Sequence, residues 1–361
     1  MVHDFKKQKR KHFKGLELKL IMKKYLLPQD GSFYKANLHC HSTVSDGELT
    51  PQQIKELYAK NGYSIVAFTD HNHFVAHNDL SDEHFLALNG VENAADEKDK
   101  PGRHNRCCDI CYICLDKSNN IHPLQIKYNI EGKFDFSPLP TDYTSENINA
   151  MIKRGRENNF FVTYNHPTWS MESFERYMTY NGMHAMEIFN FSSSVDGYNE
   201  YNPDIYDDML KSGKRIFCIA TDDNHNRAPG TCHWDSFGGF TMIKADDLKY
   251  ESVARALKMG NFYSSRGPII NALWIDTFDN SIHIECEKAV KIVATRANRR
   301  LRCIFAKEEG KDYLTHARLS INPDDIYFRL TIFDEFGNTA DTNAYFIDEL
   351  GLEFNENTYV E

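Results

Sequence analysis

The sequence predicts an α/β domain built on a parallel sheet, followed by a smaller all-β domain. From Tyr34 to about Ser265, strand-like runs alternate with helical stretches, which indicates a parallel sheet, open or closed into a barrel. After Gly267-Pro268 the chain has only short strands between turn residues, a spacing typical of an antiparallel sandwich of about seven strands. We therefore expect an arm over residues 1–32, the main domain over 33–268 and a sandwich over 269–361.

The N-terminal arm is basic, although the whole chain is acidic. Residues 1–24 carry nine Lys or Arg and two acidic residues, whereas the 361-residue chain has a net charge of −10. A basic arm can contact nucleic acid or anionic lipid, but a solvated chain end is the more common outcome. The alternation of Leu16, Leu18, Leu20 and Met22 with polar residues predicts a strand here, outside the main domain and able to pair with C-terminal strands.

The composition favours a cytoplasmic protein with no membrane partner. No apolar run approaches the roughly 18–20 residues that a transmembrane helix needs, and no signal-peptide core follows the basic start. Nine cysteines, an odd number spread through a large chain, suit a reducing compartment better than a disulfide framework.

The individual elements are predicted from apolar periodicity and capping residues. Thr50 followed by Pro51, for example, is a typical helix start. The expected helices are 51–59, 145–158, 171–180, 203–212 and 246–259. The expected strands are 34–38, 64–69, 86–91, 110–115, 160–164, 185–189, 216–220 and 237–243, then 270–275, 282–285, 290–295, 302–306, 316–321, 327–333 and 343–347. Residues 95–144 are less regular and are predicted to form long loops over one face.

Two histidines directly after the first of these strands indicate metal binding. His39 and His41 are two residues apart, so on an extended segment their side chains point the same way. Asp46 follows on a Ser-Asp-Gly turn. Imidazole suits zinc, iron or nickel, and a carboxylate adds affinity for manganese or magnesium.

Most of the other strong strands of the main domain are also followed by residues that can bind metal. In a parallel α/β sheet the carboxyl ends of the strands form one edge, where sites are built. These residues are Asp70 and His71, Glu92, His166, and Asp222, Asp223 and His225, with His104 as an exception in the loop that enters its strand. So many imidazoles and carboxylates exceed the needs of one tetrahedral ion, and two or three metals sharing a carboxylate would use them all.

Taken together, these segments resemble the PHP (polymerase and histidinol phosphatase) family from about Tyr34 to Pro268. The matching motifs are His39-x-His41 with Ser45-Asp46-Gly47, Thr69-Asp70-His71-Asn72, Gly90-Val91-Glu92 and Asp223-Asn224-His225. The tail resembles metal-dependent phosphoesterases that carry a C-terminal sandwich, through 262–268 and 328–337.

The resemblance implies a distorted (β/α)7 barrel with three metals at the carboxyl ends of its strands. By position, the first ion would be held by His39, His41, Glu92 and Asp223, the second by Glu92, His104 and His166, and the third by Asp46, His71 and His225. His122 is an alternative to His104, and Asp222 is an alternative to Asp223. Some family members have His where this chain has Asp46, and this hard ligand favours manganese or iron over zinc at the third site.

The resulting functional hypothesis is a metal-dependent phosphoesterase that uses two or three divalent ions (Mn, Fe or Zn). A metal-bridging hydroxide would hydrolyse a small phosphorylated metabolite or nucleotide, either a monoester or a cyclic or linear diester. Glu92 is a catalytic candidate as the bridging carboxylate, and either a metal-bound water or His73 is a candidate to protonate the leaving group. Arg227 and Arg266 are candidates to bind phosphate, although each is also explained as a surface arginine.

Two other functions and one structural interpretation remain open. A PHP module that acts on nucleic acid is disfavoured by the acidic body of the chain, and a hydrolase of an amide or a non-phosphate ester is disfavoured by Glu92 in place of a carboxylated bridging lysine.

The cysteines of 107–114 can form a thiolate site, but their apolar neighbours favour a buried strand. Glu187 is a candidate partner for a metal-binding histidine. The oligomeric state is not predicted.

Overall fold

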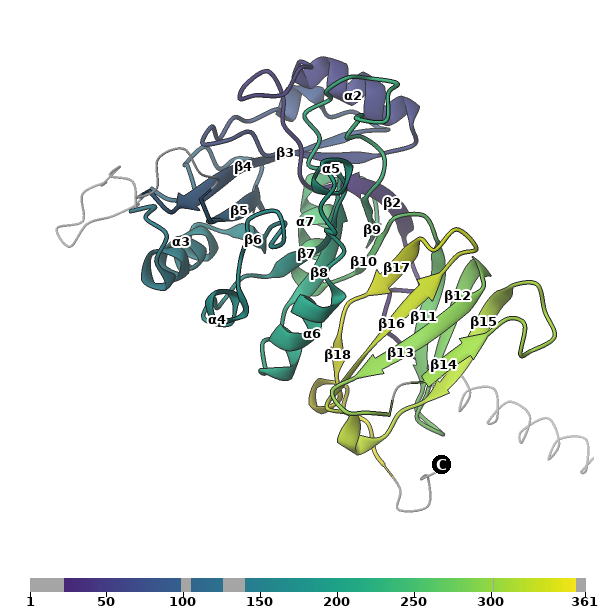
Figure 1. Ribbon diagram of the computed structural model, residues 1–361. Helices are drawn as coiled ribbons and strands as arrows, with labels where there is room; N and C mark the ends of the chain where they lie inside the picture. The colour runs from purple at the N-terminus through teal and green to yellow at the C-terminus, as the bar shows by residue number, and fades with distance from the viewer. Residues whose placement is uncertain (1–22, 99–104, 126–139, 301, 355–361) are drawn as a thin grey trace, which may run out of the picture. The chain divides into compact units, whose positions relative to one another are not determined.

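The computed structural model describes residues 23–98, 105–125, 140–300 and 302–354 (Figure 1). These residues form two compact units. The α/β unit comprises residues 30–267 and 338–344, and the β unit comprises the described residues before 30, from 268 to 337 and from 345 onward. Segment 338–344, expected in the sandwich, thus groups with the α/β unit. The strand predicted within 13–22 lies outside the described residues.

The α/β unit contains a mixed sheet. Its strand order is β17-β10-β9-β2-β3-β4-β5-β6-β7-β8. Their bounds are Thr339–Thr342, Phe262–Ser265, Phe240–Ala245, Ser32–Asn37, Ile65–Phe68, Leu86–Asp96, Cys107–Cys114, Phe160–Tyr164, Ala185–Asn190 and Phe217–Thr221. Pairing is parallel along β2-β3-β4 and along β6-β7-β8. It is antiparallel along β17-β10-β9-β2 and along β4-β5-β6.

The prediction of a parallel sheet is therefore only partly right, and the closed (β/α)7 barrel is not found. β5 returns directly beside β4, and such a direct return makes neighbouring strands antiparallel. Among the described strands, no ladder joins β8 to β2. The segments that follow these two strands are linked instead by backbone contacts, such as the bridge between Cys40 and Asn224 and the bond from the Asp223 amide to the His39 carbonyl.

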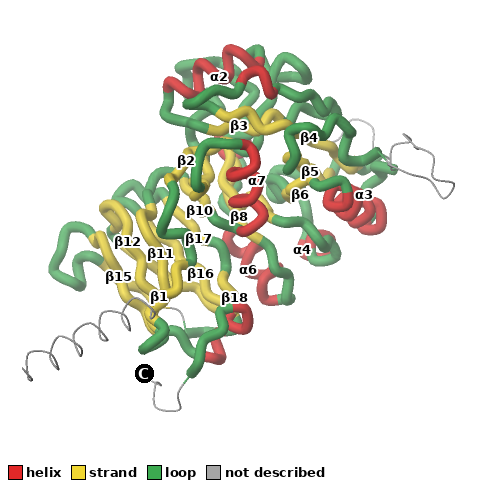
Figure 2. Tube along the Cα trace, turned by 180° about the vertical axis from the view of Figure 1, so that it is seen from behind, coloured by secondary structure: helices red, strands yellow, loops and turns green. Residues whose placement is uncertain are grey.

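Four of the five predicted helices are found to within a few residues, and α5 was not predicted. They are α2 (Pro51–Lys60), α3 (Ser145–Glu157), α4 (Phe174–Tyr177), α5 (Phe191–Val195), α6 (Pro203–Lys211) and α7 (Tyr250–Met259). α2 begins with a complete capping box, in which Thr50 and Gln53 satisfy each other's backbone amides. The helix expected over 171–180 is reduced to α4. Both ribbon and tube views show α3 alongside β5 and β6 (Figure 1, Figure 2).

One core connects all the strands from β2 to β10. Each contributes at least one buried side chain to it, such as Ile65 from β3, Ile219 from β8 and Phe262 from β10. Val253 and Leu257 of α7 belong to the same core. Because one cluster contains side chains from strands as far apart in the order as β10 and β8, the sheet curves around it. This curvature brings the segments after β2 and β8 together.

The β unit contains two antiparallel sheets, in the orders β1-β11-β12-β15 and β14-β13-β16-β18. The strands of the first sheet are Lys23–Tyr25, Ile270–Asp276, Ser281–Ala289 and Leu314–Ser320, and those of the second are Arg302–Phe305, Lys291–Arg296, Tyr327–Phe333 and Tyr345–Phe346. Short 3₁₀ turns (Asn78–Leu80, Pro323–Asp325 and Ile347–Glu349) complete the described elements. In the described part of the chain, no helix is long and apolar enough to cross a membrane.

A buried ion pair stabilises the β unit. Arg296 Nε lies 3.0 Å from Asp325 Oδ2, and both side chains are almost fully buried. Asp325 also accepts hydrogen bonds from the Asn322 backbone amide (2.8 Å) and from the Asn298 side-chain amide (3.2 Å). Removing one partner of such a pair leaves an uncompensated buried charge.

We expect Asp325→Ala to lower the free energy of unfolding of the β unit by about 3–5 kcal/mol. Asp324→Ala is the matched control, because Asp324 faces Arg300 across 3.8 Å in an exposed pair that contributes at most about 1 kcal/mol. Urea unfolding followed by circular dichroism measures both values. Equal effects of the two substitutions would contradict the role given to the buried pair.

Candidate metal centre

Four buried donor groups lie close together: two follow β2, one lies within β4 and one follows β8. His39 Nε2 and His41 Nε2 lie 3.1 Å apart. Asp223 Oδ1 is 3.1 and 3.0 Å from these two nitrogens, and Glu92 Oε2 is 3.2 and 3.3 Å from them. Donors around a tetrahedral ion with bonds of ~2.0–2.1 Å are ~3.3 Å apart. The mutual spacing of His39 Nε2, His41 Nε2 and Asp223 Oδ1 therefore fits a divalent ion, and Glu92 Oε2 lies beside both nitrogens.

Backbone bonds between the chain segments that follow β2 and β8 hold this group together. The Asp223 amide donates to the His39 carbonyl at 3.0 Å, and the His41 amide donates to the Asn224 carbonyl at 3.0 Å. Asp223 itself has φ +53°, a left-handed conformation that non-glycine residues adopt rarely and that often occurs at functional sites. Its Oδ1 is buried without a hydrogen-bond partner, as expected of an atom that binds a cation.

Buried carboxylates and carbonyls orient the imidazole rings. Glu187 Oε1 lies 2.8 Å from His39 Nδ1, and the same carboxylate accepts bonds from the Thr221 hydroxyl (2.7 Å) and the His166 amide (3.0 Å). A proton on His39 Nδ1 leaves the lone pair of Nε2 directed at the donor group. His225 Nδ1 is similarly placed 3.1 Å from the Asp223 carbonyl. Such partners are typical of metal-binding histidines.

Mutual charge compensation shifts the pKa values in this group. Burial alone would lower the pKa of His39, but the charges of Asp223 and Glu92 outweigh it and raise that pKa well above its ordinary value. Burial would also lower the pKa of His41, but the neighbouring carboxylates of Asp223 and Glu92 raise it to about 9. The same histidines hold the pKa values of Glu92 and Asp223 well below normal against the effect of burial. The carboxylates are thus ionised and available to a cation.

The second oxygen of Glu92 belongs to another donor group. Glu92 Oε1 lies 3.4 Å from His166 Nε2, and Asp109 Oδ2 lies 3.8 Å from the same nitrogen. Ligand atoms of Glu92, Asp109 and His166 all lie within 4.8 Å of one another. Glu92 is almost fully buried, and its two oxygens face different histidines. It therefore has the geometry of a carboxylate shared between two ions.

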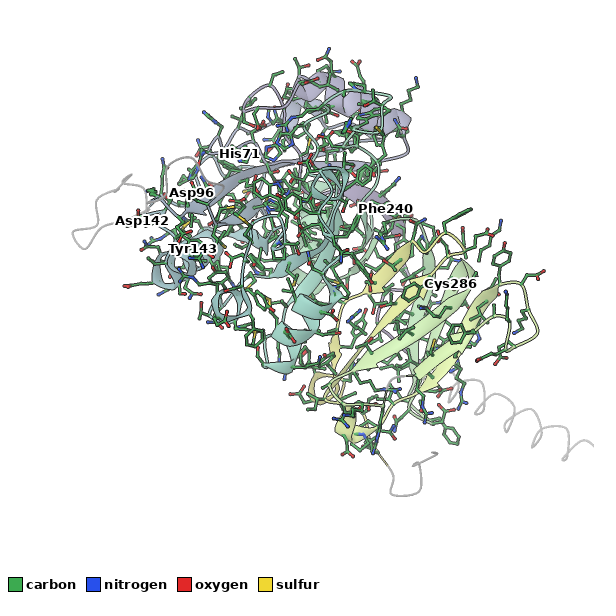
Figure 3. The ribbon with its side chains drawn as sticks, viewed as in Figure 1. His71, Asp96, Asp142, Tyr143, Phe240 and Cys286 are labelled. Atoms are coloured by element: carbon green, nitrogen blue, oxygen red, sulfur yellow. The ribbon has the colours of Figure 1, made fainter. Side chains whose placement is uncertain are left out.

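A third group is more open to solvent. It comprises Asp46, His71, His225 and, through its other ring nitrogen, His41. Asp46 Oδ2 is 3.4 Å from His225 Nε2, and Asp46 Oδ1 is 3.8 Å from His71 Nε2. His71 directly follows the β3 segment and is labelled in Figure 3. A hydrogen bond and the charge of His225 lower the pKa of Asp46 well below its ordinary value.

Asp70 shapes the turn that carries Asp46, and it is not a member of any donor group among the described residues. Its carboxylate accepts bonds from the amides of Ser42 (2.7 Å) and Ser45 (3.1 Å) and from both hydroxyls. Gly47 closes the same turn so tightly that an added Cβ would lie 2.4 Å from the His41 carbonyl oxygen. The Ser-Asp-Gly sequence therefore positions Asp46 through backbone contacts.

A cavity of about 180 Å³ connects the three groups. It is lined by Asp46, His71, Glu92, Asp109, His166, Trp169, Ser192, Ser193, Asp196, Asp223, His225 and Arg227. Arg227 is half exposed at this cavity, with Nη2 3.6 Å from Asp46 Oδ2. The cavity is thus polar, holds carboxylates on its walls and has one arginine at its rim.

The structure gathers eight of the nine predicted metal ligands, all except His104, which lies outside the described residues. Of the open alternatives, Asp222 is used elsewhere: it accepts bonds from the Tyr58 hydroxyl (2.8 Å) and the amides of 237–239. His122 accepts the Leu124 amide at 3.2 Å and belongs to none of the donor groups.

Two other predicted residues are not brought to the cavity. His73 is exposed, with Nδ1 2.6 Å from the His71 carbonyl, because Asn72 at φ +60° turns the chain after His71. The Arg266 guanidinium lies over the rings of Phe189 and Tyr201, with centroid distances of 5.2 and 4.6 Å, and lines a different cavity.

Sequence reasoning missed Asp109 and assigned Cys111 to the core. Both lie on β5, and Cys111 is grouped with His39 and Glu92. The direction of β5 was the missing information. In an antiparallel strand, residues at the start and in the middle of the strand, rather than those after it, reach this edge.

Comparisons with known proteins find similar structures only. No protein-family model matches the chain, and no curated protein does. A two-domain protein from Bacteroides vulgatus, described as containing a predicted PHP-like metal-dependent phosphoesterase, is 12% identical, with 90% of this chain and 98% of that one covered and a TM-score of 0.41.

Two further similar structures match only slightly more than half of this chain. A protein from Bifidobacterium adolescentis, described as a metal-dependent phosphoesterase, is 14% identical, covering 57% of this chain and 91% of that one with a TM-score of 0.35. An amidohydrolase from Chromobacterium violaceum is 17% identical, covering 54% and 88% with a TM-score of 0.31. The similarity is too weak to bear on substrate or reaction.

We expect Glu187→Gln to weaken divalent-metal affinity by about 10- to 100-fold, because His39 loses the charged partner that fixes its ring. Glu172→Gln is the control, since this carboxylate accepts bonds from the Tyr180 hydroxyl and belongs to none of the donor groups. Isothermal titration of metal-free protein with Mn²⁺ measures the affinities. An unchanged affinity in Glu187→Gln would contradict the orienting role.

Proposed function

We propose that this protein is a metal-dependent phosphoesterase that hydrolyses a small phosphorylated metabolite or nucleotide, as a monoester or a cyclic or linear diester. The observation that carries the proposal is Glu92, whose two oxygens face separate histidine groups across a small polar cavity. Sites with two metal ions sharing ligands in this way are common in enzymes that cleave phosphate esters. A small phosphorylated substrate and a cytoplasmic location remain predictions from the sequence.

Up to three divalent ions, Mn, Fe or Zn, would be held by the three donor groups. His39, His41, Glu92 and Asp223 would hold the first, Glu92 and His166 the second, and Asp46, His71 and His225 the third. The buried oxygen Asp223 Oδ1, which has no hydrogen-bond partner, and the spacing of about 3 Å between donors support this fit. When bound, such ions lower the pKa of water and neutralise charge on a phosphoryl group.

The protein's own contribution is to position ligands and to recognise the phosphate. Glu187, Asp70 and backbone carbonyls fix the orientation of the donors, so the site needs little rearrangement when it binds a cation. Arg227 stands at the rim with a planar donor group suited to a phosphate oxygen. A cavity of about 180 Å³ is small compared with typical ligand pockets of roughly 300–1,000 Å³. It suits a phosphoryl group whose remaining substituent extends outward.

We expect Glu92→Ala to lower both the bound metal and the turnover, because one substitution removes a donor from two groups. Elemental analysis of protein purified without chelator, combined with a panel of phosphomonoesters and phosphodiesters, measures both properties. Removing metal from the wild type should abolish turnover, and re-addition should restore it. Full activity in Glu92→Ala, or in the metal-free wild type, would contradict the proposal.

We expect Arg227→Ala to reduce kcat/KM by about 10- to 100-fold, the loss of one charge-assisted contact worth about 1.5–3 kcal/mol, without changing metal content. Arg266→Ala is the matched control, because its guanidinium is stacked on aromatic rings in another cavity. Steady-state kinetics on the best substrate of the panel gives the comparison. A larger effect of Arg266→Ala would reverse the assignment.

A further inference from the structure

We propose that Asp109, and not His104, supplies the third donor of the group formed by Glu92 and His166, and that this position consequently selects Mn²⁺ over Zn²⁺. The inference rests on the proposed metal-dependent function and extends it to metal selectivity. Two carboxylates with one imidazole form a harder, more oxygen-rich set than the one-carboxylate, two-imidazole set that His104 would complete.

The backbone places Asp109 at this group. β5 lies antiparallel between β4 and β6, with Cys111 opposite Glu92. Asp109 is two residues before Cys111, so its side chain is on the same face of the sheet as Cys111 and Glu92. The Asp109 carbonyl accepts the Asn165 amide at 3.0 Å, which ties it to the residue just before His166.

The carboxylate of Asp109 lacks the partners that a buried acid needs. Its side chain is 8% exposed. Oδ2 accepts only a weak thiol bond, from Cys107 at 3.3 Å, and lies 3.8 Å from His166 Nε2. Oδ1 is buried with no hydrogen-bond partner, and the residue lines the cavity beside Glu92. Two neighbouring buried carboxylates beside one imidazole carry an excess of negative charge that a divalent cation would neutralise.

Cys111 is the competing donor from the same strand. Its thiol already has a partner, because Asn165 Nδ2 lies 2.9 Å from Sγ, and it is grouped with His39 rather than with His166. Among the described residues, the donor group that contains both Glu92 and His166 is completed by Asp109. The oxygen donor is therefore the better third ligand.

The test is a titration of the full-length, metal-free protein with Mn²⁺ and, separately, with Zn²⁺, followed by calorimetry and by electron paramagnetic resonance for Mn²⁺. Asp109→Asn should bind one Mn²⁺ fewer per chain, or bind that ion with a reduced affinity. The reduction should exceed the roughly 10- to 100-fold drop in affinity that the loss of an outer partner causes. Asp109→His should lose Mn²⁺ but retain Zn²⁺. His104→Ala should bind both metals as the wild type does.

Melting curves of the metal-free variants show whether the loss is specific. Metal-free Asp109→Asn should melt no lower than the wild type, because it removes a buried charge beside Glu92 while keeping the shape of the side chain. Mn²⁺ binding at the wild-type level by Asp109→Asn would overturn the inference. The loss of an ion in His104→Ala would also overturn it, and this second result is decisive even if Asp109→Asn does not fold. If the wild type binds Mn²⁺ but hydrolyses no phosphoester, only the proposed function fails.

Discussion

The pairing of the buried Glu92 carboxylate with imidazoles from three chain segments is the interaction on which the whole site depends. Glu92 lies within β4, and its amide donates to the Thr69 carbonyl at 3.0 Å, while His71 forms an isolated bridge with it. Its oxygens then reach His39, His41, His71 and His166 at 3.1–3.4 Å. A carboxylate buried this deeply is stable only when compensated by positive charge, from protonated imidazoles or from a cation. The ligand geometry and the fold around β4 are therefore coupled.

A second set of buried carboxylates supports the site without belonging to its principal cluster. Asp70 holds the turn before Asp46, Asp222 ties the segment after β8 to residues 237–239, and Glu187 holds the ring of His39. Glu200 accepts the backbone amides of Thr168 and Trp169, at 3.1 and 2.7 Å, in the loop that follows His166. Each of these acids accepts backbone amides or ring nitrogens, so the donors are fixed by a rigid surrounding shell.

Much of the site was predictable, because strand periodicity and the positions of strand ends indicate which side chains lie close together. His39 and His41 share a face through the two-residue period, and Asp223 and His225 were predicted because they follow the end of β8. What the sequence could not reveal was strand direction. Whether β5 runs parallel or antiparallel depends on the path of its connection, and only the antiparallel path brings Asp109 to the cavity. The left-handed turn at Asn72 directs the chain after His71 away from the cavity, which leaves His73 exposed.

The closed barrel implied by the resemblance is also not found, because the strands are connected differently from what was expected. The sheet curves around the core that includes α7, and the segments of Cys40 and Asn224 are joined by an isolated bridge and not by a ladder. The central claim is that these segments carry a shared-metal site. A crystal structure of the protein grown with Mn²⁺, with anomalous diffraction at the manganese edge, tests it most directly. The account predicts anomalous peaks on both sides of Glu92, one between His39, His41 and Asp223 and one beside His166. Ordered density for these side chains with no peak at either position would contradict it.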